Sequence, residues 1–416
     1  MQRDAENPAN LGNATGGAGG ALDFYVGTFN LPYIFSLRFS PNGNQLHVLR
    51  ISKATGPHSW LSLSPDQRTL YATAWTKPTC SVAAYRNRGS TQQLELLGSR
   101  PVRNKPGYVT GSSSHIFSVG GPTGEVFRVE RGGGIGPLVQ ELDFAGGDQE
   151  ADAPKAPDAV PHGDFGGLRH GAHGCDLGPD GRTLYVADIG RNCTWTFSVD
   201  DTGRRRVLHD QRRHAAPRDD DGPRHAWPHP NGEVLYVVQE HSSIVDVFCI
   251  QRDAQGAVAA LRHAQAASLL PEGKNARDYW ADEVRLSGTT GGAGPEYLFA
   301  STRGLESRTR GYVSAFALNQ DGTLKRTTAV DIWETPTSGG IANAIEPAPR
   351  PVRLAHSDLP LHIMAMTDSE AGRVFVLGFD GEKIRMVSSI TLDAPAGEDS
   401  RQGLVEPATA VWVRPR

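Results

Sequence analysis

A β-hairpin unit recurs along this 416-residue chain and constrains the fold more than any other feature. Each copy is an alternating apolar stretch, a Pro-Asp or Pro-Asn turn, and a second stretch with the order Leu-Tyr-Val or Leu-Tyr-Ala, as in 61–74 (LSLSPDQRTLYATA), 175–189 and 226–240. Strand pairs repeated at a regular spacing are typical of propellers, in which each repeat is one supersecondary unit. The repeat therefore predicts an all-β propeller.

Seven positions fit the start of an inner strand, one for each expected blade. They lie near His58, Ser112, His173, Arg224, Asp282, Asn343 and Ala408, 51 to 65 residues apart. The last start leaves no room for three further strands, whereas the N-terminal part offers three strands, at 24–29, 33–39 and 45–51, that lack an inner one. We expect the two ends to pair and complete one blade, because a closed ring removes exposed sheet edges. The prediction is one seven-bladed domain over 21–416, preceded by a Gly/Ala/Asn-rich segment, 1–20, expected to be disordered.

Composition narrows the classes of partner. A net charge of −4 gives no electrostatic reason to expect nucleic acid or an anionic membrane, and no apolar run approaches the roughly 20 residues of a membrane span. Without an apolar signal region we expect a cytoplasmic protein if Met1 is the native start; sequons at Asn13 and Asn192 leave secretion open. The four cysteines are too scattered for a disulfide scaffold, and no CxxC or HExxH metal motif is present.

Strand direction gathers polar residues at one end of the expected channel. The first and second strands of a blade are antiparallel, so the start of one and the end of the other lie at the same mouth. The starts contribute His58, Trp60, His173, Arg224, Asp282 and Asn343, and the ends contribute Trp75, Asp188, Glu240, Arg303 and Asp368. We therefore expect the site at this mouth. The long loops 143–170 and 266–281 enter inner strands at the same end, where a lid would lie.

Each of these residues also has a purely structural interpretation. The arginines could form ion pairs between blades with Glu240 and Asp368, and the two tryptophans could simply pack at the rim. The segment 335–340, which contains Ser338 and Gly339, could turn the chain or present backbone N–H groups to an anion.

Several motifs carry a resemblance to a known family. They are VGTF (26–29), GAHG (171–174), PRHAW (223–227), QE (239–240), ADEVRLS (281–287), STRG (301–304), GYVSAF (311–316) and TPTSGG (335–340) followed by Asn343. Together they resemble fungal 3-carboxy-cis,cis-muconate lactonizing enzymes, relatives of the propeller 6-phosphogluconolactonases. The resemblance implies a seven-bladed cycloisomerase that uses no metal or organic cofactor. It places the active-site histidine at His173, the arginines at Arg224 and Arg303, and the glutamate at Glu240. The chain departs from the family at His225, where an aromatic residue is usual, and in the loop 143–170.

These residues suit a lactonisation. Arginine binds carboxylates bidentately and stays charged, so Arg224 and Arg303 are expected to clamp the substrate. His173 is the expected general acid, with Glu240 either raising the pKa of His173 or delivering the proton itself. The remaining expected substrate contacts are His58, Trp60, Trp75, Asp282, Ser338, Gly339, Asn343 and Asp368.

The predicted function is a cofactor-independent cyclase that closes an oxygen-containing ring on a small unsaturated, carboxymuconate-like substrate. The alternatives are a cyclase of natural-product assembly, including a hetero-Diels–Alder catalyst, a lactonase, and a propeller that only binds a partner. A strongly basic mouth would favour the cyclase of a carboxymuconate-like substrate, and an apolar mouth would favour the natural-product cyclase.

Overall fold

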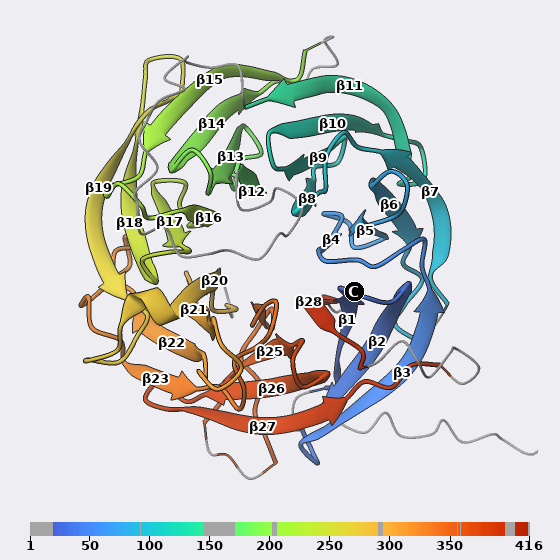
Figure 1. Cartoon of the computed structure of the whole chain (residues 1–416), viewed down its shortest axis with the longest axis vertical. Helices are drawn as coiled ribbons and strands as arrows, with labels where there is room; N and C mark the ends of the chain where they lie inside the picture. Colours follow the sequence, from blue (N-terminus) through green and yellow to red (C-terminus); the bar gives the residue numbers. More distant parts are fainter. Residues whose placement is uncertain are drawn as a thin grey trace, which may run out of the picture.

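Seven four-stranded antiparallel sheets surround a central axis in the computed structural model (Figure 1), as the sequence predicted. The structure describes residues 20–91, 93–144, 171–201, 206–289, 294–355, 357, 359–395 and 404–414. The segment 1–19 and the greater part of the loop 143–170 lie outside the described residues. The disorder expected for residues 1–20 and the lid expected at the loop 143–170 therefore stay predictions. Within the described ranges, no helix is long and apolar enough to cross a membrane.

The two strands of each blade nearest the axis position the site. The innermost strands are β4 (Leu61–Leu63), β8 (Tyr108–Gly111), β12 (Ala172–Leu177), β16 (Pro223–Pro228), β20 (Tyr279–Leu286), β24 (Ile345–Pro347) and β28 (Pro407–Trp412). The second strands are β5 (Thr69–Ala74), β9 (His115–Gly120), β13 (Thr183–Asp188), β17 (Val234–Gln239), β21 (Tyr297–Gly304), β25 (His362–Asp368) and β1 (Leu22–Thr28).

The two outer strands complete each blade. The third strands are β6 (Ser81–Arg86), β10 (Thr123–Val129), β14 (Cys193–Val199), β18 (Ile244–Arg252), β22 (Tyr312–Ala317), β26 (Arg373–Phe379) and β2 (Tyr33–Ser40). The outermost strands are β7 (Glu95–Pro101), β11 (Ile135–Asp143), β15 (Leu208–Ala215), β19 (Val258–Ser268), β23 (Asp331–Glu334), β27 (Ile384–Thr391) and β3 (Gln45–Lys53). A short 3-10 helix, η2 (Ala276–Asp278), precedes β20.

The two ends of the chain close the ring. Strand β28 pairs antiparallel with β1, with Phe24 opposite Trp412, and the sheet continues through β2 to β3. The rings of Phe24 and Trp412 are 4.4 Å apart. The predicted closure is confirmed, and it ties the last inner strand to the first three strands of the chain.

The repeated Pro-Asp or Pro-Asn turn works in the same way in all three copies. Asp66 Oδ1 accepts a hydrogen bond from the backbone N–H of Arg68 at 3.0 Å, and Asp180 Oδ1 does the same from Arg182 at 2.9 Å. In the third copy the side chain of Asn231 accepts from the N–H of Glu233 at 2.9 Å. A short polar side chain that bonds the backbone two residues ahead stabilises a tight turn, which explains why the sequence signature marks hairpins.

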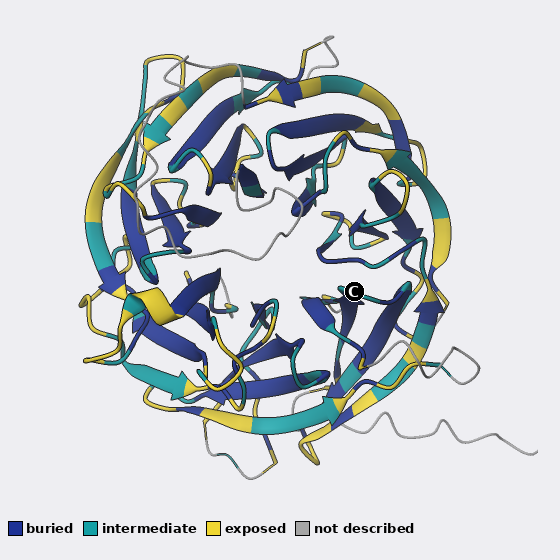
Figure 2. Cartoon of the chain, in the orientation of Figure 1, coloured by how far each residue is buried: buried dark blue, intermediate teal, exposed yellow. Residues whose placement is uncertain are grey.

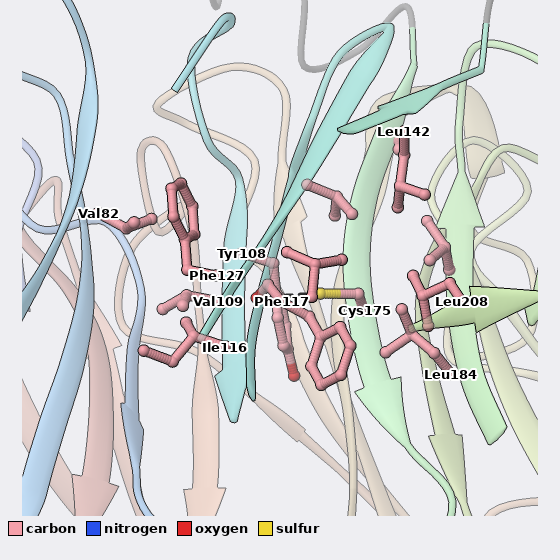
Figure 3. Packing of buried hydrophobic residues seen from close by; sticks show 14 of the residues in the cluster. Val82, Tyr108, Val109, Ile116, Phe117, Phe127, Leu142, Cys175, Leu184 and Leu208 are labelled. Carbon is pink, nitrogen blue, oxygen red and sulfur yellow. Dashed lines mark hydrogen bonds between the residues drawn. The ribbon is translucent and has the colours of Figure 1, made fainter. Parts of the chain in front are cut away.

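Burial follows the distance from the axis. Figure 2 shows buried inner and middle strands and an outermost ring in which exposed and partly exposed residues alternate with buried ones. Apolar side chains pack between neighbouring sheets, as Figure 3 shows for Phe117, Cys175 and Leu184. Phe117 is 1% exposed, and removing a phenylalanine ring from such a core costs about 3–5 kcal/mol. This packing fixes the blades around the axis.

Two strand boundaries differ from the prediction. The inner strand predicted to start near Ser112 is β8, which ends at Gly111, so Ser112 lies in the turn at the far end of that strand. The predicted loop 266–281 is shorter than expected, because β19 extends to Ser268 and β20 already begins at Tyr279. Both errors arise because the Pro-Asp turn signal is missing from these two blades.

Candidate active site

A β-bulge at the same place in three consecutive blades positions the central residues of the site. In β12 the pairing passes from Ala172 to Gly174, so His173 is the extra residue. Arg224 is the extra residue of β16, and Asp282 is the extra residue of β20. A bulge leaves its extra residue unpaired and redirects the side chain. Three equivalent positions therefore carry His173, Arg224 and Asp282 around one mouth of the channel.

A pocket opens at this mouth, with about 650 Å³ of empty space including its opening to solvent. All four predicted catalytic residues line it, as do the predicted contacts Trp60 and Trp75. Its walls are formed by Phe29, Ser59, Trp60, Trp75, Gly107, His173, Ile189, Arg224, Glu240, Trp280, Glu283, Arg303, Ile341, Ala342, Ala344 and Ala408. The strand geometry thus brought the predicted residues together as expected.

The two arginines share one buried carboxylate. Asp282 Oδ1 lies 3.2 Å from Arg303 Nε and 3.7 Å from Arg224 Nη2. Arg224 also donates from Nε to Glu240 Oε2 at 2.7 Å and from Nη1 to the Asp282 carbonyl at 2.6 Å. Burying a charge is costly unless it is paired, and these bonds hold both guanidinium groups at the pocket wall. Burial raises the pKa of Asp282, and the two arginines oppose that rise.

The sequence suggested Asp368 as an ion-pair partner of Arg303, and the structure shows a different partner. Asp368 accepts from the Thr337 hydroxyl and from the Ala371 N–H, and the partner of Arg303 is Asp282. Arg303 Nη1 also donates to the carbonyl groups of Gly340 and Ile341. The segment after 335 therefore positions Arg303 through its backbone oxygens.

His173 lies between positive charges. Its pKa is well below the ordinary histidine value, mainly because the ring is buried and further because of Arg224, His225 and Arg303. The expected rise of this pKa by Glu240 does not occur: the carboxylate of Glu240 binds Arg224 instead. Among the described residues, Nδ1 of His173 has no hydrogen-bond partner. His173 is therefore a neutral imidazole in the pocket wall whose buried Nδ1 makes no hydrogen bond to the described residues.

Aromatic rings form much of the remaining wall. Trp75 lies 5.6 Å from Phe29 and donates from Nε1 to the Pro106 carbonyl at 2.9 Å. The Arg303 guanidinium lies over Trp280, 4.8 Å from the ring centre. Trp60 stacks on Tyr108 at 3.9 Å. The pocket thus combines flat apolar faces with two arginines.

Five predicted contacts lie behind the pocket wall. His58 is buried and bonds the Thr73 carbonyl and the Tyr85 hydroxyl. Ser338 donates its hydroxyl to Glu370, and Asn343 donates to the Thr302 carbonyl. Gly339, with φ of +94°, has no room for a Cβ beside Asn343, and Asp368 at the end of β25 bonds Thr337 and Ala371. Like Asp282, they do not line the pocket themselves.

Sequence reasoning missed three lining residues that carry an aromatic ring or a charge. Phe29 follows β1, Trp280 lies at the start of β20, and Glu283 follows the bulge in β20. Trp280 was missed because the strand start was placed at Asp282. Strict alternation over 279–286 would place Trp280 and Glu283 on opposite faces, and the bulge at Asp282 brings both to the pocket. In the described ranges, no group of three or more His, Cys, Asp and Glu side chains is arranged to hold a metal ion.

The comparisons with known proteins agree with this architecture. A model of the family "Lactonase, 7-bladed beta-propeller" matches residues 23–337. Muconate cycloisomerase 1 of Cutaneotrichosporon cutaneum is 39% identical over 94% of this chain and 98% of its own length. The carboxy-cis,cis-muconate cyclase of Neurospora crassa is 29% identical over 89% of this chain and 95% of its own length.

A solved structure shares the fold at lower identity. A putative 6-phosphogluconolactonase from Bacteroides fragilis superimposes with a TM-score of 0.71 at 19% identity, covering 95% of this chain and 98% of that one. These relatives confirm the resemblance found in the sequence and the prediction of an enzyme. The chain belongs to the lactonase family of seven-bladed β-propellers.

Proposed function

We propose that this enzyme is a lactonizing isomerase that cyclises a cis,cis-dienedioate of the muconate type, with or without a third carboxylate. The observation that carries the proposal is the pair of arginines, Arg224 and Arg303, fixed at one pocket by their shared Asp282. A substrate with carboxylates at both ends needs two cationic contacts. The relatives that span nearly the whole chain are named for muconate chemistry, which supports this substrate class.

The reaction joins a carboxylate oxygen to a carbon of the diene and delivers a proton to the carbon next to the other carboxylate. Arg224 and Arg303 hold the carboxylates and stabilise the enolate-like charge that develops, a role for which fixed donors are suited. His173, as a neutral imidazole, offers a hydrogen bond to the same groups. The aromatic faces of Trp60, Trp75 and Phe29 fit a planar conjugated chain and keep water from it.

The mouth is neither strongly basic nor purely apolar. Each arginine has a carboxylate partner, and aromatic and small aliphatic side chains form most of the rest of the wall. The names of the relatives compared above concern muconates and a gluconolactone, which favours lactone chemistry over natural-product assembly.

Hydrolysis of a lactone is the second candidate, because the matching family model and the Bacteroides fragilis structure carry lactonase names. The test is to mix the purified protein separately with cis,cis-muconate, 3-carboxy-cis,cis-muconate and 6-phosphogluconolactone, following diene absorbance and acid release. Loss of either diene supports the proposal. Hydrolysis of the gluconolactone with both dienes untouched would replace it with the lactonase function.

A further inference from the structure

Glu283 is a buried carboxylic acid in the pocket wall to which the sequence assigned no role. It occupies the residue after the bulge in β20, and His225 occupies the equivalent place in the neighbouring strand β16. The two side chains meet: His225 Nδ1 lies 2.7 Å from Glu283 Oε1. Glu283 and His225 are each about 1% exposed. The same bulges that present Arg224 and Asp282 therefore also build a His–Glu pair.

All donors to this carboxyl group converge on one of its oxygens. Glu283 Oε1 accepts hydrogen bonds from His225 Nδ1, from Arg285 Nη1 at 2.6 Å and from the backbone N–H of Val284 at 3.2 Å. Oε2 has no donor within the part of the chain that the structure describes, and Glu283 contributes to the wall of the pocket. A carboxyl group with one oxygen saturated by donors carries its proton on the other oxygen. Here that oxygen is the one left for the cavity.

The tautomer of His225 is fixed by its neighbours. Arg224 Nη1 lies 3.3 Å from Nε2 and can only donate, so Nε2 accepts and Nδ1 carries the hydrogen that is given to Glu283. Burial, Arg224 and Arg285 hold the pKa of His225 well below its ordinary value, which keeps the ring neutral. Gly174 of the adjacent blade provides the space, because a Cβ there would lie 2.7 Å from His225 Cδ2.

Charged and titratable groups from five strands surround Glu283. Strand β16 provides Arg224 and His225, β20 provides Asp282 and Arg285, β12 provides His173 and Asp176, β8 provides Tyr108, and β24 provides Glu346. Burial is the main cause that raises the pKa of Glu283, to about 7, and Arg285 and Arg224 oppose that rise. The acid thus stays protonated into the neutral range, unlike an exposed glutamic acid.

We propose that Glu283 is the catalytic residue that delivers the proton, and that His225 and Arg285 are its positioning residues. The inference rests on the proposed lactonisation. A substrate carboxylate oxygen forms the new C–O bond, and the π electrons of the attacked double bond pass toward the other carboxylate. The α carbon then takes the proton from Glu283 Oε2, breaking that O–H bond and leaving a carboxylate. Water returns one proton to Glu283 before the next turnover.

The pH dependence follows from this role. Glu283 must be protonated when the substrate binds, so kcat/KM, which reports groups of the free enzyme, falls as the pH rises through about 7. His173 has its pKa well below the ordinary range and does not produce this midpoint. Asp176, whose pKa burial raises to about 8, does not line the pocket, so we expect the midpoint near 7 to come from Glu283.

The test compares E283Q with E346Q. Glu346 is a buried acid that binds the same arginine, Arg285 Nε to Oε2 at 2.8 Å, but it does not line the pocket. We expect E283Q to lower kcat by roughly 10²–10⁴-fold, the usual contribution of a general acid, and to abolish the midpoint near pH 7. The binding constant of adipate, a saturated dicarboxylate, should change less than about threefold. E346Q should lower kcat far less than E283Q and should keep a midpoint, displaced to lower pH because Arg285 then has one carboxylate fewer to neutralise.

Three results overturn the inference while leaving lactonisation in place: wild-type kcat in E283Q, an unchanged midpoint in E283Q, or an equal loss in E346Q. If E283Q does not fold, E283D takes its place. That variant withdraws the carboxyl group by one methylene and should lower kcat by at least about tenfold, whereas wild-type kcat in E283D would refute the assignment. A wild-type protein that consumes no diene refutes the proposed function itself, before any variant is compared.

Discussion

The two arginine clusters along the propeller axis differ in their balance of charge. At the pocket mouth, Arg224 and Arg303 share two carboxylates, those of Glu240 and Asp282. Deeper in the channel, Arg285 alone serves Glu283 and Glu346, and its Nη2 lies 3.2 Å from the Tyr108 hydroxyl that bonds Asp176. The mouth has one arginine for each of its two carboxylates, whereas the deeper cluster has too few cations to keep all its acids ionised.

This difference is visible in the acids of the deeper cluster. Burial raises the pKa of Asp176 to about 8 and that of Glu283 to about 7. An acid without a full cationic partner keeps its proton when it is removed from water. The same arginine–carboxylate chemistry therefore serves binding at one depth and proton storage at another.

The largest effect should come from removing a cation at the mouth. R303M deletes the guanidinium that faces the pocket and leaves Asp282 with one fewer partner. We expect kcat/KM for the diene to fall by on the order of 10²–10³ or more. R308M, at a side chain that is 86% exposed, is the control and should retain wild-type kinetics. Equal kinetics in both variants would remove Arg303 from the site.

A smaller loss is expected at His173. Glutamine has a hydrogen-bond donor but not the fixed geometry of the ring, so H173Q should lower kcat/KM by at most roughly 10–100-fold, the cost when a hydrogen bond to a charged group is not made. Because the imidazole is neutral above its strongly lowered pKa, the shape of the pH–rate profile between pH 6 and 8 should stay as in the wild type. A profile that loses its neutral midpoint in H173Q would instead make His173 the titrating acid.

The deeper cluster should be tested through stability. The pKa of Asp176 is about 8 in the folded protein and near 3.8 as the ordinary value, so the unfolded chain loses this proton at lower pH than the folded one. The contribution of Asp176 to stability therefore falls as the pH rises from about 4 to about 8. D176N, which stays neutral, should gain at least about 1 kcal/mol over the wild type between pH 5 and pH 8.

Urea unfolding at the two pH values measures this gain. D180N, in the exposed turn of the same hairpin, is the control, since an asparagine side chain can still accept the bond from Arg182. Parallel changes with pH in the wild type and D176N would show that Asp176 is ionised in the folded state.

The smallest effect is expected at the aromatic wall. W75F keeps a smaller flat ring in the pocket, loses the bond from Nε1 to the Pro106 carbonyl and weakens the contact with Lys105 Nζ, which lies 3.6 Å from the Trp75 ring centre. KM should rise by less than about fivefold with kcat unchanged, which corresponds to about 1 kcal/mol of uniform binding. A large fall in kcat would assign Trp75 a part in the chemistry that its position does not suggest.

The hairpin repeat was sufficient to predict the seven blades, the closure of β28 on β1 and the mouth at which His173, Arg224, Glu240 and Arg303 meet. Strand ends are encoded locally, by turn residues and alternation. The prediction failed where that local code was weak, at β8 and at the start of β20.

Which residues line the pocket could not be read from strand ends alone. A bulge shifts the pairing by one residue, and that shift decides whether Asp282 or Glu283 reaches the cavity. The direction in which the pKa of His173 is shifted likewise depends on burial and on arginines from two other blades. Such long-range contacts leave no mark in the sequence near His173.

The proton balance of turnover tests the central claim most directly. Cyclisation turns a dienedioate with two ionised carboxylates into a lactone with one, so it takes up one proton, whereas hydrolysis of a lactone releases one. The measurement follows diene absorbance and a pH indicator together in weak buffer, with cis,cis-muconate or its 3-carboxy derivative as substrate. We predict one proton taken up for each diene lost, and the loss of both signals in R303M. Diene that persists unchanged, or acid released from an added lactone in its place, would contradict the account.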